Sequence, residues 1–60
     1  MTKHDIYVSA IETAKSELAQ AERNLELVEP ALAVWAALEV AAKQEKLNTL
    51  FKLAKKELTG

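Results

Sequence analysis

The sequence contains no cysteine, a single histidine, one proline at position 30 and one glycine at position 60. A disulfide framework is therefore excluded, and a zinc site would have too few sulfur and nitrogen ligands. With so little glycine and proline, the chain has almost nothing to form the tight turns of a β-sheet protein. Ala, Leu, Glu and Lys dominate the remainder, which favours an all-α fold.

Long uninterrupted apolar runs are also missing. The longest apolar stretch, residues 31–42, contains Glu39 and is shorter than the roughly 20 residues that a membrane-spanning helix needs. Residues 1–10 turn polar within a few positions, which is not the pattern of a secretory signal. Together with the lack of cysteine, these features predict a cytoplasmic protein with no membrane segment.

Signals for helix ends divide the chain into two helical segments. Thr2 and Asp5 have the spacing of a capping box. Pro30 disfavours helical angles at the preceding residue and suits the first residue of a second helix, while Gly60 can close that helix. We therefore expect a single domain over residues 1–60, with helices at about 3–28 and about 30–58 and a turn at about 28–30.

Both segments carry residues at alternating intervals of three and four, the spacing of a coiled-coil seam. The predicted seam consists of His4, Tyr7, Ile11, Ala14, Leu18, Ala21, Leu25 and Val28 in the first segment and Ala33, Ala37, Val40, Gln44, Leu47, Phe51, Ala54 and Leu58 in the second. The step from Val28 to Ala33 is five residues, so a single straight helix cannot hold both rows on one side. The phase change at Pro30 predicts an antiparallel, coiled-coil-like hairpin of two helices.

Side-chain size and charge support the hairpin. Residues whose numbers add to 61 or 62 lie opposite each other, and most of these layers pair a large with a small side chain, such as Leu25 with Ala37. Residues 1–30 carry three basic and six acidic side chains, a net charge of −3; residues 31–60 carry five basic and three acidic ones, a net charge of +2. Two alternatives remain open: one long bent helix that dimerises along its length, and three helices with a break at Asn48–Thr49.

A 60-residue chain buries little apolar surface by itself, and small folds compensate with disulfides, a metal or self-association. Because the first two are excluded, we expect a homo-oligomer, with a dimer favoured and a four-helix bundle or a higher helical oligomer as its form. Gln44 is the one polar residue in the predicted seam of the second segment. A buried amide there can fix register and oligomeric state; alternatively, Gln44 bends toward solvent.

A second apolar row lies on the far side of residues 31–42. It is formed by Leu32, Trp35, Leu38 and Ala42, and Leu27 joins it from the first segment. An exposed patch around a Trp is unusual for a soluble monomer, so we predict a protein interface. Completion of a symmetric dimer is the preferred interpretation, and binding of a different protein is the alternative.

No arrangement of residues predicts catalysis, a metal site or a cofactor site. His4 has no second histidine, the Ser and Thr residues have no activating base, and no glycine-rich phosphate loop is present. We expect a non-enzymatic protein-protein interaction module, an adaptor, regulator or inhibitor; its expected shape resembles the small helical-hairpin dimers found among plasmid and phage regulators, an analogy of architecture without a shared motif. The alternative is a nucleic-acid-binding regulator whose phosphate contacts are Lys43, Lys46, Lys52, Lys55 and Lys56.

Overall fold

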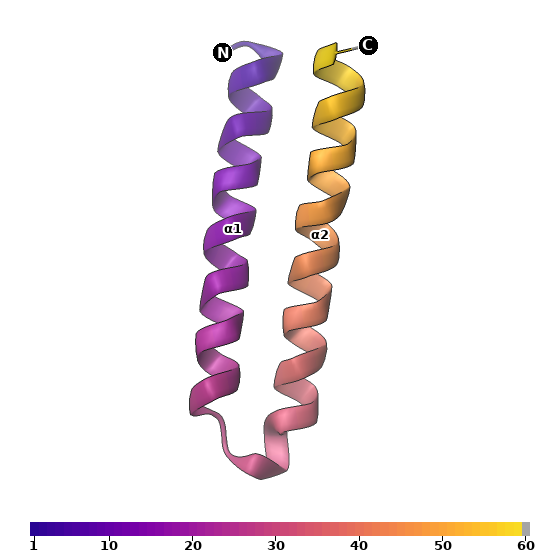
Figure 1. Ribbon diagram of the computed structural model, residues 1–60. Coiled ribbons are helices and arrows are strands. Elements are labelled where there is room, and N and C mark those ends of the chain that lie inside the picture. Colours follow the sequence, from indigo (N-terminus) through magenta and orange to yellow (C-terminus); the bar gives the residue numbers. More distant parts are fainter. Residues whose placement is uncertain (60) are drawn as a thin grey trace.

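The computed structural model describes residues 1–59 and contains, within them, two long helices joined by a short turn (Figure 1). Helix α1 spans Lys3–Leu27, the 3-10 helix η1 spans Pro30–Leu32, and helix α2 spans Ala33–Thr59. The two long helices run antiparallel and side by side, which confirms the predicted all-α hairpin. The chain reverses between α1 and α2, so the single bent helix is wrong. Helix α2 continues through residues 48 and 49, so the three-helix alternative is wrong as well. The predicted role of Gly60 lies outside the described residues.

The start of α1 is held by the capping box that the sequence predicts. The backbone N–H of Asp5 donates to Thr2 Oγ1 at 3.1 Å, and the backbone N–H of Thr2 donates to Asp5 Oδ2 at 3.3 Å. Each side chain thus satisfies a backbone donor that the first turn of the helix leaves without a partner.

The reversal of the chain is made without glycine. Val28 and Glu29 are both extended, with ψ of 152° and 146°. At Glu29 this follows from Pro30, because proline disfavours the helical region at the residue before it. Pro30 then starts η1, where the backbone N–H of Leu32 donates to the carbonyl oxygen of Glu29 at 2.8 Å. Among the described residues none has a positive φ, so proline and two extended residues alone turn the chain.

The two helices pack along a narrow seam. Its buried residues are Ala14, Ala21, Leu47 and Ala54, and Ala14 is only 1% exposed. Three of these four side chains are methyl groups, so the helix axes can approach closely, with Leu47 as the one large buried side chain.

Two ion pairs between the helices report their register. Lys3 Nζ lies 3.2 Å from Glu57 Oε2, and Lys46 Nζ lies 2.9 Å from Glu17 Oε1. The numbers of these pairs add to 60 and 63, on either side of the predicted 61 or 62. The helices are therefore aligned as the pattern of large and small residues indicates.

The predicted seam of α2 consists of two rows of residues, each repeating every seven positions. One row is correct and the other is wrong. The row Ala33, Val40, Leu47, Ala54 faces α1, but the half-buried residues beside it are Ala36, Lys43 and Leu50, whereas Ala37, Gln44 and Phe51 are exposed. Helix α2 is thus rotated about its axis relative to the prediction. This rotation turns Leu50 toward α1 and brings the charge of Lys43 near Glu17, which lies on the same side of the hairpin.

The molecule is a single layer of helices, with extents of 45 × 18 × 10 Å. Its radius of gyration is 14.0 Å, whereas a compact chain of this length has about 10 Å. Both broad sides of the hairpin are consequently open to solvent or to a partner.

Candidate functional site

The two broad sides can be told apart from the helical geometry of α2. Residues three positions after the inward row lie on one side of it, and residues four positions after lie on the other. Lys43 belongs to the first set and lines a shallow groove together with Glu17, whereas Gln44 and Phe51 belong to the second set. Phe51 therefore lies on the side of the hairpin opposite that groove.

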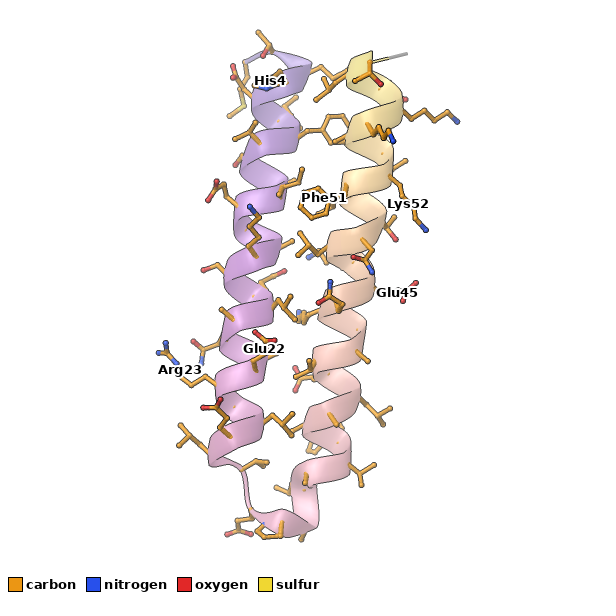
Figure 2. All side chains as sticks on the ribbon, viewed as in Figure 1. His4, Glu22, Arg23, Glu45, Phe51 and Lys52 are labelled. Carbon is orange, nitrogen blue, oxygen red and sulfur yellow. The ribbon has the colours of Figure 1, made fainter. Side chains whose placement is uncertain are left out.

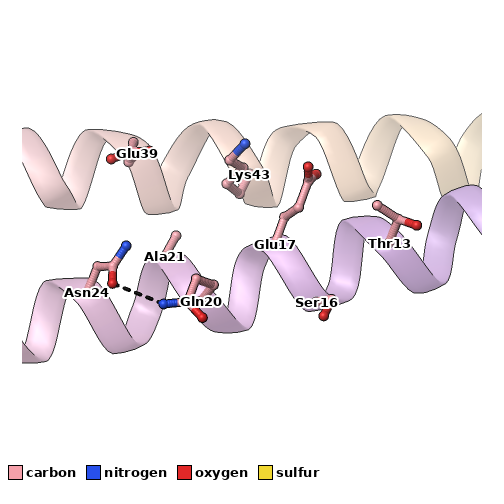
Figure 3. A pocket seen from close by; sticks show the side chains of 8 residues that line it. All are labelled: Thr13, Ser16, Glu17, Gln20, Ala21, Asn24, Glu39 and Lys43. Atoms are coloured by element: carbon pink, nitrogen blue, oxygen red, sulfur yellow. Dashed lines mark hydrogen bonds between the residues drawn. The ribbon is translucent and has the colours of Figure 1, made fainter.

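One broad side carries a groove of mainly polar side chains, here called the polar groove (Figure 3). It is lined by Thr13, Ser16, Glu17, Gln20, Ala21, Asn24, Glu39 and Lys43. The amide Nε2 of Gln20 donates to Asn24 Oδ1 at 3.2 Å along its rim. No histidine accompanies Thr13 or Ser16 in the lining of the polar groove, since His4 lies near the chain ends (Figure 2).

Glu17 is the electrostatic centre of the polar groove. Lys46 donates a hydrogen bond to its carboxylate at 2.9 Å, and Lys43 adds a second positive charge nearby. The hydrogen bond from Lys46, and after it the charge of Lys43, hold the pKa of Glu17 below its usual value. The charges of this side are therefore compensated within the chain.

The structure does not bring the lysines of α2 to one surface. The predicted nucleic-acid contacts are Lys43, Lys46, Lys52, Lys55 and Lys56. Lys43 and Lys46 are directed to Glu17 in the polar groove, while Lys52 projects from the outer edge of α2 (Figure 2). Lys55 and Lys56 follow in the last turns of the helix. Two of the five predicted contacts thus lie beside Glu17, and nucleic-acid binding by the lysines of α2 stays a prediction.

The apolar patch predicted beside the turn is exposed. This turn-end patch comprises Leu27, Leu32, Trp35, Leu38 and Ala42. Leu27, Trp35 and Leu38 are 79%, 68% and 64% exposed. Val34 is also largely exposed at this end of the hairpin. The sequence pattern did not predict it as part of the patch.

The broad side opposite the polar groove, here called the open face, is apolar. It is formed by Ile11, Leu18 and Leu25 of α1 and by Ala37, Gln44, Phe51 and Leu58 of α2. Phe51 is 45% exposed, and its ring lies over the gap between the two helices (Figure 2). The sequence pattern assigned these residues to the seam within one chain; the three residues of α1 are half-buried, whereas the four residues of α2 are exposed. Val8 borders the open face and is exposed as well.

Gln44 lies in the middle of the open face, not in the seam between α1 and α2. Its side chain is exposed and donates to Asn48 Oδ1 at 3.1 Å. The placement of a buried amide opposite Leu18 within one hairpin is therefore wrong. A role of Gln44 in the register of an assembly stays a prediction.

Comparison with known proteins gives no match: no family model fits the chain, and neither a curated protein nor a solved structure matches it. Within residues 1–59, no helix has the combined length and apolar character needed to cross a membrane. The same residues hold no group of three or more His, Asp or Glu side chains placed to bind a metal ion. The candidate sites are thus two apolar surfaces, the turn-end patch and the open face.

Proposed function

We propose that this chain is a non-enzymatic protein-protein interaction module, an adaptor, regulator or inhibitor, that self-associates and presents its turn-end patch to another protein. The observation that carries this proposal is the exposure of Trp35, 68% accessible at the start of a rigid helix with Leu38 one turn away. Large exposed apolar patches mark interaction sites, and Trp is the residue most enriched among those that dominate binding energy.

Self-association is supported by how little the hairpin buries. Ala14, Ala21, Leu47 and Ala54 are its buried residues among those described, and only one of them is large. Stable domains usually place two layers of secondary structure around a core, and this hairpin is one layer. A 60-residue chain without disulfides gains the missing burial most directly from another protein surface.

The turn-end patch is tested by placing a photoreactive amino acid at position 35 in cells and comparing it with the same substitution at Glu45, an exposed position elsewhere on α2. We expect crosslinks from position 35 to a different protein and none from position 45. Crosslinks from position 35 only to another copy of the chain would make the patch a dimer interface. Equal labelling from both positions would contradict a specific contact surface.

A further inference from the structure

We propose that a second copy of the chain covers the open face, with α1 of each hairpin on α2 of its partner and both turns at the same end. This rests on the proposed self-association and assigns that contact to the open face, so that the turn-end patch remains available to a different protein. Four observations support a second copy on this face: the exposed area of the hairpin, its single layer of helices, the match of the face to itself, and the net charges of the two halves of the chain.

The exposed area of the hairpin matches what a dimer would bury. The chain exposes 4707 Å², whereas a folded monomer of 6.6 kDa is expected to expose about 3900 Å². The excess is about 800 Å², the area that each partner buries in a protein interface of standard size.

The apolar side chains of the open face can form a core with those of a second hairpin. Ile11, Leu18 and Leu25 are half-buried and line the same broad side of the hairpin as Phe51, with Ile11 at the height of Phe51. In a hairpin only 10 Å thick, these side chains have no second layer above them. A second hairpin laid on this face makes a four-helix bundle, in which the same side chains point into a common core.

The open face is complementary to itself. Within one hairpin, residues of α1 and α2 lie at the same height when their numbers add to about 62, as the ion pairs Lys3–Glu57 and Glu17–Lys46 show. When α1 lies on α2 of a partner with the turns at one end, the same sum holds between the copies. Leu25 then meets Ala37 of the partner subunit, and Ile11 meets Phe51 of the partner subunit. Because a two-fold axis relates the copies, each of these two contacts occurs twice in the dimer.

Charge selects this arrangement over the other two-fold one. The half of the chain that contains α1 has three basic and six acidic side chains, and the half that contains α2 has five basic and three acidic ones. Placing α1 on α2 of the partner therefore brings opposite net charges together in both pairs of helices. With the turns at opposite ends, two negatively charged α1 helices would lie side by side, which costs free energy and slows association.

The test compares Phe51→Glu with Leu53→Glu by light scattering over a range of concentrations. The two residues are matched, at 45% and 43% exposure, but Leu53 lies seven residues after Lys46 and therefore on the side of the polar groove. We expect wild type and Leu53→Glu to be dimers, and Phe51→Glu to show a dimer Kd raised roughly 30-fold or more. A Phe51→Glu variant that dimerises like wild type would overturn the assignment.

A second measurement uses the unaltered chain, so it does not depend on how Phe51→Glu folds. In a mixture of isotope-labelled and unlabelled wild-type protein, filtered NMR spectra detect contacts between copies. We expect contacts from the Phe51 ring to the methyl groups of Ile11 of the partner subunit. Contacts to Gln44 of the partner subunit would place the turns at opposite ends and overturn the arrangement.

The two proposals fail in different ways. Wild type that stays monomeric at every concentration contradicts self-association itself and, with it, this inference. A wild-type dimer whose intermolecular contacts come from the Trp35 ring and not from Phe51 leaves self-association standing but overturns the open face as its surface.

Discussion

The open face and the polar groove are the two broad sides of the same helix pair, and consecutive residues of α2 lie on different sides. On α2, Lys43 points to the groove and Gln44 to the open face. The groove side satisfies its charges within the chain, through Glu17 and Lys46. The open face presents Phe51 with no apolar partner above it. In a hairpin one layer thick, one broad side can thus have its charges paired within the chain while the other leaves apolar side chains without a packing partner.

The largest expected effect comes from the seam that both sides share. Leu47→Ala removes the one large buried side chain and should lower the free energy of unfolding by about 3 kcal/mol. Urea denaturation followed by circular dichroism measures this change. Leu53→Ala is the control, since Leu53 is partly exposed and should cost far less. Equal losses in the two variants would mean that the seam is not the core.

A gain in stability is expected on the open face. Gln44→Leu should raise the stability of the proposed dimer by about 1 kcal/mol, and its melting temperature by about 5 °C, because an apolar side chain replaces an amide on the face that the proposed second copy covers. If the amide specifies register, the variant should also form mixed oligomers in light scattering. Glu45→Leu is the neighbouring control and changes helix propensity little. A lower melting temperature with unchanged stoichiometry would refute the register role.

The smallest effect is expected in the polar groove. Lys46 and Lys43 lower the pKa of Glu17 from 4.5, so its carboxylate stabilises the fold above that value and loses this contribution as the pH falls through the lowered pKa. Glu17→Gln should reduce the melting temperature at neutral pH by no more than about 3 °C, because the pair is exposed.

The pH dependence makes that prediction specific. As the pH falls below 4.5, Glu17→Gln should lose less stability than wild type, because it has already lost the ion pair. Glu45→Gln serves as control, and thermal melts at several pH values give the comparison. A melting curve of Glu17→Gln that falls with acid as steeply as that of wild type would show that the pair does not contribute.

Much of the fold follows from local signals in the sequence. Pro30 and the five-residue step from Val28 to Ala33 predict the reversal, and the capping box at Thr2 predicts the start of α1, because both depend only on neighbouring residues. The exposure of Trp35 follows from helical spacing relative to the inward row.

The rotation of α2 does not follow from the sequence. Both alternations of three and four share Ala33, Val40, Leu47 and Ala54, so the pattern cannot decide whether Lys43 or Gln44 turns inward. That choice depends on side-chain sizes across the gap and on Glu17, which lies 26 positions earlier in the chain than Lys43. A preference for apolar residues therefore selected Phe51 for the seam, whereas in the structure Leu50 is half-buried and Phe51 is exposed.

The Lys3–Glu57 ion pair has a practical consequence for anyone who wishes to attach this protein to something. It joins the first turn of α1 to the last turns of α2, so both chain ends lie at the end of the hairpin away from the turn (Figure 1). A fluorophore, affinity tag or sensor surface joined to either end stands about 36 Å from Trp35, because 24 residues of helix separate Trp35 from Thr59. The hairpin can therefore be attached through either chain end while the turn-end patch stays accessible.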